Sequence, residues 1–161
     1  MKSLVVYFSA YGTTKAFAEE IAKQTGSDIA EIVPVIPYDC DKEHYNALAD
    51  YAKKEHDQNI RPEIKNPIDI SAYDTVFVGY PMWWYTMPMI LYTFFENQNW
   101  NGKRVIPFNM HMGSRDGGTY KTVRELAKGA EVLEGLPLSM QTVESGAFAD
   151  QIKRWINGLG L

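Results

Sequence analysis

One stretch of the sequence decides the fold: Leu4-Val5-Val6-Tyr7-Phe8-Ser9-Ala10-Tyr11-Gly12-Thr13-Thr14-Lys15. Its first five residues are an apolar run rich in β-branched and aromatic side chains, which predicts a buried strand. From Phe17 to Gly26, apolar residues recur every three to four positions, which predicts a helix. The stretch therefore predicts a strand, a tight hydroxyl-rich loop and the start of a helix.

The loop between this strand and this helix predicts an anion site. The start of a helix leaves backbone N–H groups unpaired and carries partial positive charge, so it favours an anion. Ser9, Thr13 and Thr14 can add hydroxyl donors, and Gly12 lets the backbone approach a ligand closely. We expect a phosphate group to bind here without a cationic side chain. The alternative is an ordinary helix start, in which Thr13 or Thr14 caps the helix.

The known phosphate motifs do not fit this loop. The G-x-x-x-x-G-K-[ST] spacing of a P-loop is absent, and Gly12 stands alone where a dinucleotide fingerprint has three glycines. A phosphatase loop needs a cysteine nucleophile, and this loop has none. We therefore expect the phosphate to be bound and not attacked.

Length and composition predict a single domain over residues 1–161, with 45% hydrophobic and 22% charged residues. A net charge of −4 without a basic cluster argues against nucleic-acid binding. No apolar run approaches ~18 residues, so we expect no membrane span. The sequence shows no leader pattern, and the lone Cys40 excludes an internal disulfide and a cysteine-rich metal site. We expect a soluble, cytoplasmic protein without a metal.

Strand and helix patterns alternate along the rest of the chain. Apolar runs predict further strands at 28–33, 75–80, 104–109 and 132–138, and helical spacing predicts helices at 43–57, 89–97, 119–128 and 147–157. This alternation, with no internal repeat, predicts an α/β fold with one open parallel sheet between helices.

Three loops with unusual chemistry leave the carboxyl edge of this predicted sheet, where such sheets bind ligands. The first is the phosphate loop. The second carries Met82-Trp83-Trp84-Tyr85 between two prolines, and the third is glycine-rich with Asn109, His111, Ser114 and Arg115. The aromatic run alone is also typical of packing against a neighbouring helix. Together, the three loops predict a site for a planar, phosphorylated ring system, because aromatic side chains stack on planar rings.

The chain resembles the flavodoxin-like family over essentially its full length. The resemblance rests on S-A-Y-G-T-T-K at 9–15, on P-M-W-W at 81–84 followed by Pro88, and on P-F-N-M-H-M-G-S at 107–114. It implies a three-layer α/β/α fold with a doubly wound, five-stranded parallel sheet in the order 2-1-3-4-5. It also implies that the protein binds FMN.

By this resemblance, three groups of residues would bind FMN. The phosphate would be held by Ser9, Tyr11, Gly12, Thr13 and Thr14. The isoalloxazine ring would be flanked by Pro81, Met82, Trp83 and Trp84. Its pyrimidine side would be lined by Asn109, His111, Gly113 and Ser114. The third loop departs from the family pattern, because Met110 and Met112 stand where relatives usually carry small residues.

Two flavin-based functions follow, and the sequence favours the first. The first is an electron carrier whose redox-protein partner docks at the exposed ring edge, with Asp39, Asp41 and Asp116 as a source of negative charge. The second is a reductase that passes hydride from NAD(P)H to a quinone, for which Arg115 and His111 are candidate cations. No insertion builds a substrate pocket, which favours the carrier. The sequence leaves monomer or homodimer open, and it predicts no catalytic residue.

Overall fold

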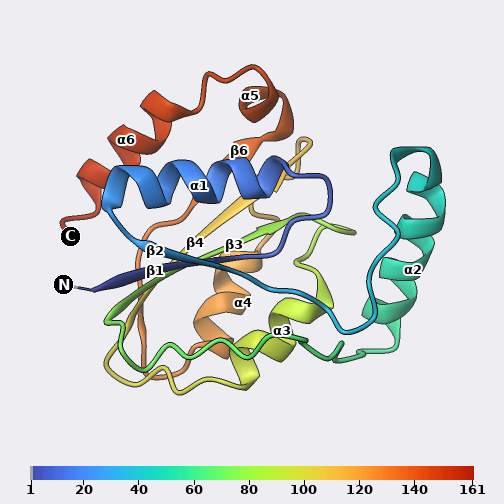
Figure 1. The fold of residues 1–161 in the computed structure, drawn as a ribbon, viewed down its shortest axis with the longest axis horizontal. Helices are drawn as coiled ribbons and strands as arrows, with labels where there is room; N and C mark the ends of the chain where they lie inside the picture. Colours follow the sequence, from blue (N-terminus) through green and yellow to red (C-terminus); the bar gives the residue numbers. More distant parts are fainter. Residues whose placement is uncertain (1) are drawn as a thin grey trace.

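The structure is a computed structural model that describes residues 2–161 (Figure 1). The strands are β1 (Ser3–Tyr7), β2 (Asp28–Glu31), β3 (Thr75–Pro81), β4 (Arg104–His111), β5 (Glu131–Val132) and β6 (Leu136–Ser139). The helices are α1 (Thr13–Thr25), α2 (Tyr45–Asp57), α3 (Met89–Glu96), α4 (Thr119–Leu126), α5 (Met140–Glu144) and α6 (Ala149–Gly158), and a 3-10 turn, η1 (Lys42–His44), precedes α2. Strands and helices alternate, as predicted.

The sheet has the predicted topology. Its strands follow the order β2-β1-β3-β4-β5, and each pairing along this path is parallel. In the central ladder Val5 lies opposite both Ile29 of β2 and Phe77 of β3. This confirms the α/β prediction of a doubly wound sheet in the order 2-1-3-4-5, which places the ends of β1, β3 and β4 side by side.

The last strand differs from the prediction of one strand at 132–138. The structure divides it into β5 and β6, both of which pair with β4. The break lies beside Pro107, which has no N–H to donate to a neighbouring strand. Gly135 fills the gap so closely that a Cβ atom there would lie 2.7 Å from the Pro107 carbonyl oxygen. The missing donor of Pro107 thus explains why the ladder is interrupted.

Helices cover both faces of the sheet. Figure 1 shows α1 and α6 on one side and α3 and α4 on the other. Because successive residues of a strand point to opposite faces, β1 contributes Val5 to the core under α1 and Val6 to the core over α3. The first core includes Phe17 and Ile152, and the second includes Ile90. The three layers predicted from the sequence are therefore present.

Helix α2 lies outside these layers. Figure 1 shows it beyond the carboxyl ends of the strands, at the right of the view, instead of over a face of the sheet. It buries only Leu48, Ala52 and Glu55. An irregular segment contributes Ile70 to the buried core in its place, with Ile68 partly buried beside it. Helix α2 is thereby free to form a wall at the carboxyl edge of the sheet.

None of the helices within residues 2–161 has the length and apolar character that crossing a membrane requires.

Candidate ligand-binding site

A cavity of about 850 Å³ lies at the carboxyl edge of the sheet, and its wall brings together the three predicted loops. Of the predicted binding residues, the lining contains Tyr11, Thr13, Thr14, Pro81, Met82, Trp83, Trp84, His111, Gly113 and Ser114. Ser9, Gly12 and Asn109 lie outside the lining. The sequence thus located the cavity, and the binding role of each residue remains a prediction.

Ser9 and Gly12 shape the first loop from behind the lining. The Ser9 hydroxyl oxygen accepts hydrogen bonds from the backbone N–H groups of Gly12 (3.1 Å) and Lys15 (3.3 Å). Gly12 occupies the N-cap position of α1 with φ +90°, a conformation that glycine adopts readily, and Ser9, not a threonine, accepts the N–H of Lys15 in the first turn. The alternative prediction, in which Thr13 or Thr14 caps α1, is therefore wrong. This leaves both threonine hydroxyls available to a ligand.

Two hydroxyl groups in this part of the cavity are buried without a partner. Among residues 2–161, only three buried side-chain polar atoms lack a hydrogen bond, and two of them are Tyr11 Oη and Thr14 Oγ1. Thr14 is 1% exposed, and both residues line the cavity. Leaving such a group unpaired costs about 1–3 kcal/mol. Burial raises the pKa of Tyr11, so its hydroxyl remains a donor at neutral pH. The donor set fits a phosphate group.

The aromatic loop is a tight turn with strained backbone. Trp83 and Thr86 exchange two backbone hydrogen bonds of 2.8 and 3.1 Å, which closes the turn. The two central residues have φ +53° (Trp84) and φ +60° (Tyr85), as in a type I′ turn, although neither is glycine or asparagine. Such a backbone costs roughly 1–2 kcal/mol per residue. Strain of this kind often accompanies a functional site, where it fixes a loop for binding.

The two indoles have different surroundings. Trp83 is half-buried, and its ring lies edge-on to Phe8 (5.4 Å between centroids) and Tyr38 (5.2 Å). Trp84 is 46% exposed, and its indole N–H donates to the Ala49 carbonyl oxygen of α2 at 2.7 Å. Trp83 is therefore fixed by packing, whereas Trp84 joins the aromatic loop to α2.

His111 ends β4 at the third loop. Its Nδ1 atom accepts the backbone N–H of Gly113 at 2.9 Å, which assigns the ring proton to Nε2. Burial lowers the pKa of His111, and the positive charge of Arg115 lowers it further, so the imidazole is neutral at neutral pH. Arg115 itself is exposed and lies outside the lining. Neither candidate cation therefore places a positive charge in the cavity.

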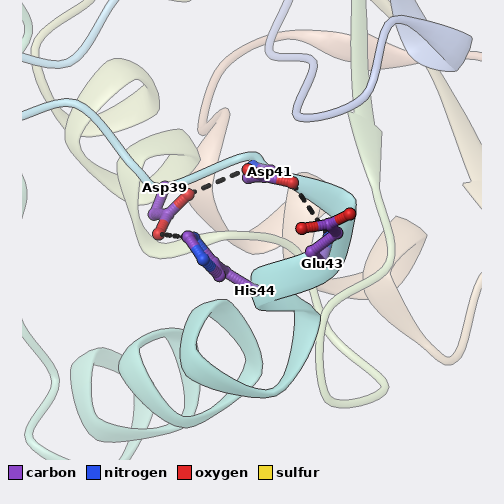
Figure 2. Close-up of polar contacts among 4 residues, drawn as sticks. All are labelled: Asp39, Asp41, Glu43 and His44. Atoms are coloured by element: carbon purple, nitrogen blue, oxygen red, sulfur yellow. Dashed lines mark hydrogen bonds and ion pairs between the residues drawn. The ribbon is translucent and has the colours of Figure 1, made fainter.

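Several acidic side chains lie in or near the wall of the cavity. Within the described part of the chain, Asp50 is the only charged side chain of the lining. Figure 2 shows Asp39, Asp41, Glu43 and His44 in the segment before α2. The Asp39 carboxylate accepts the Asp41 N–H (3.1 Å) and pairs with His44 Nδ1 (2.8 Å), and these contacts lower its pKa. Asp39 and Asp41 also act electrostatically on Tyr11, which places them beside the site.

Sequence reasoning missed one wall of the cavity. Helix α2 contributes Tyr45, Asn46, Ala49 and Asp50, and the start of α5 contributes Met140. The sequence predicted the helix and its apolar side, but that pattern is equally typical of a helix that packs on a sheet. No signal in the sequence shows that this helix lies across the ends of the strands.

No group of three or more potential metal ligands occurs in the part of the chain that the structure describes. Fold and cavity together define an α/β protein with a cavity at the carboxyl edge of a doubly wound sheet. The sequence profile of the flavodoxin family matches residues 2–159, and the chain belongs to this family.

The chain is also similar to solved structures. A presumed flavoprotein from Bacteroides eggerthii DSM 20697 is 31% identical, with a TM-score of 0.81 over 99% of this chain and 98% of that one. A flavoprotein from Lactobacillus acidophilus NCFM, solved in complex with FMN, is 25% identical, with a TM-score of 0.72 over 91% of this chain and 98% of that one. A search of curated proteins found no match.

Proposed function

We propose that the protein binds FMN at the carboxyl edge of its sheet and uses it to transfer electrons. The observation that carries this proposal is the pair of buried, unpartnered hydroxyls of Tyr11 and Thr14 at the start of α1. A phosphate group there would accept a hydrogen bond from each hydroxyl and would lie at the positive end of the helix dipole. The similar Lactobacillus acidophilus flavoprotein, solved with FMN, supports this choice of ligand.

The other two loops suit the flavin ring. Trp83 and Trp84 supply aromatic surface next to the phosphate site, and Gly113 and Ser114 supply backbone groups on the opposite loop. The strained turn at Trp84 and Tyr85 is closed by its own hydrogen bonds, so it need not be ordered when the ring binds.

FMN, when bound, supplies a ring that accepts and donates electrons. The residues around it set how easily the ring takes up negative charge. Asp50 lines the cavity, Asp39 and Asp41 lie beside it, and His111 is neutral. Like charges repel, so this environment disfavours a negatively charged reduced flavin. That supports a low-potential electron carrier, whose redox-protein partner would dock at the exposed edge of the site.

Replacement of Thr14 by valine tests the phosphate assignment. Thr14→Val removes a hydroxyl that has no protein partner, so the free energy of unfolding of the apoprotein should rise by about 1 kcal/mol. FMN affinity should fall at least ten-fold, because a hydrogen bond to a charged group contributes roughly 1.5–3 kcal/mol.

Thr93 of α3 offers a matched control. Its buried hydroxyl also lacks a partner, but Thr93 does not line the cavity, so Thr93→Val should leave FMN affinity unchanged. Flavin fluorescence titration and urea unfolding measure the two quantities. An unchanged FMN affinity in Thr14→Val would refute the phosphate assignment.

A second candidate function is an NAD(P)H-dependent reductase of a quinone. The wall formed by α2 favours it, because Tyr45, Asn46 and Ala49 enclose the cavity on a side that a carrier would leave open to its partner. Stopped-flow mixing of the FMN-loaded protein with NADH and NADPH separates the candidates. A reductase is reduced rapidly by one of them, whereas a carrier is reduced slowly without its own reductase.

A further inference from the structure

The third loop, residues 112–118, has an unusual backbone and little side-chain packing of its own. Gly113, Arg115, Gly117 and Gly118 all have positive φ, at +125°, +55°, +56° and +82°. Met112, its one large apolar side chain, is 81% exposed. Apolar side chains of its own therefore do little to select one conformation of this loop, which leaves a larger part to its polar contacts.

Two chains of buried and partly buried hydrogen bonds reach this loop from β3, β4 and α4. In the first, Tyr120 Oη donates to Asn109 Oδ1 (2.5 Å), and Asn109 Nδ2 donates to the Arg115 carbonyl oxygen (2.8 Å). In the second, Tyr80 Oη donates to Thr119 Oγ1 (2.7 Å), which donates to the Asp116 carbonyl oxygen (2.6 Å).

The two chains therefore end on consecutive carbonyl groups of the loop. Asn109 and Tyr80 are 0% exposed, and Thr119 is 1% exposed. They start from β4, β3 and α4, so three elements fix one short segment. Each polar atom in the two chains has a partner, and a buried network that is fully paired favours a single conformation.

We propose that Asn109 and Tyr80 are positioning residues, which hold the loop at 112–118 in the conformation that binds the flavin without touching the flavin. This inference rests on the proposed FMN site. Asn109 lies outside the cavity lining, whereas Gly113 and Ser114 of the held loop lie in it. A loop that is already ordered avoids the entropy loss that ordering it upon binding would cause.

The test compares Tyr80→Phe and Asn109→Leu with Tyr73→Phe. Tyr80→Phe removes one hydroxyl from the second chain of hydrogen bonds. Asn109→Leu removes both hydrogen bonds of the Asn109 side chain and replaces it with a side chain of similar size. Tyr73 donates a hydrogen bond to Asp28 at the amino end of the sheet (2.7 Å), so Tyr73→Phe is the control for loss of a tyrosine hydroxyl.

Hydrogen–deuterium exchange of the apoproteins is measured first, because it does not depend on FMN. In both variants, exchange at 112–118 should rise at least five-fold while the central strands stay protected, and the control should show no change there. FMN affinity should then fall at least five-fold in both. If Asn109→Leu does not fold, Tyr80→Phe alone decides.

Unchanged exchange at 112–118, or a rise spread evenly over the whole sheet, would overturn the positioning role. Unchanged FMN affinity with a mobile loop would overturn it as well. A wild-type protein that does not bind FMN would refute the proposed function instead, and the exchange data would still show whether the two chains hold the loop.

Discussion

The indole N–H of Trp84, in the aromatic loop, donates a hydrogen bond of 2.7 Å to the backbone carbonyl oxygen of Ala49 in α2. The amino group of Lys53, one turn further along α2, lies 5.9 Å from the centre of the same indole. Helix α2 packs on no face of the sheet (Figure 1), so its position depends on such contacts with the loops and on its contacts with α3. The aromatic loop therefore lines the cavity itself and also supports the wall that α2 forms.

Trp84→Phe should loosen α2. The change keeps an aromatic ring but removes the donor to Ala49, and one such bond contributes about 0.5–1.5 kcal/mol. Hydrogen–deuterium exchange should rise roughly three- to ten-fold within residues 45–57 and nowhere in β1, β3 or β4. Tyr85→Phe, which changes the 76% exposed neighbour in the same turn, is the control. Equal exchange of α2 in both variants would contradict the role of Trp84.

Glu55→Gln should change how stability depends on pH. Glu55 is 6% exposed in α2 and accepts a hydrogen bond from Tyr38 Oη at 2.6 Å. Burial raises the pKa of Glu55, and the hydrogen bond from Tyr38 opposes this in part. The folded state therefore holds this proton more tightly than the unfolded state. The resulting stabilisation is complete below the ordinary glutamate pKa, about 4.3, and is lost as the pH rises through the raised pKa.

Glutamine cannot ionise, so the variant should not lose this stabilisation. We expect Glu55→Gln to be more stable than the wild type at pH 8 and nearly equal to it at pH 4. The difference in the free energy of unfolding at pH 8 should be about 1.4 kcal/mol for each unit by which folding raises the pKa of Glu55. Urea unfolding at both pH values measures the difference. The same difference at pH 4 and pH 8 would show that Glu55 does not titrate in this way.

Gly117→Ala should disturb the contact between the second and third loops. A Cβ atom at Gly117 would lie 2.6 Å from Met82 Cε and 2.9 Å from the Tyr85 carbonyl oxygen, and the residue has φ +56°. At Gly118, φ is +82° but no atom lies within 4 Å of such a Cβ. Both variants should lose about 1–2 kcal/mol from backbone strain.

Only Gly117→Ala displaces the backbone of Tyr85, so it should lose more stability than Gly118→Ala. FMN affinity should also fall further in Gly117→Ala, by an additional ten-fold or so, because the aromatic loop moves. Thermal unfolding and flavin fluorescence measure these effects. Equal losses in the two variants would mean that the contact with Tyr85 is unimportant.

The sequence predicted those parts of the fold that depend on local patterns. Apolar runs located β1, β3 and β4, and the alternation of strands and helices predicted the parallel sheet. It missed α5, whose first residue follows the N-cap Ser139, because five residues are too few for a helical period to show. It also merged β5 and β6, because the effect of Pro107 falls on the neighbouring strand and leaves no sign in the sequence of that strand.

The sequence predicted residues that line the cavity where the loop itself carries the chemistry, as at Thr14 and Trp83. Asn109 was predicted to line the flavin, but its position depends on partners at 115 and 120, and the structure places it outside the lining. The contribution of α2 depends on where a whole helix packs. Contacts of this kind are set by tertiary structure, and the spacing of residues along the chain does not predict them.

The most direct test of the account compares FMN with riboflavin, which is the same ring system without the phosphate. The apoprotein is titrated with each, and the quenching of flavin fluorescence is measured. We predict one FMN bound per chain, with riboflavin bound at least a hundred-fold more weakly, because the hydroxyls of Tyr11 and Thr14 and the start of α1 meet the phosphate. Equal affinity for the two flavins, or no binding of FMN, would contradict the central claim.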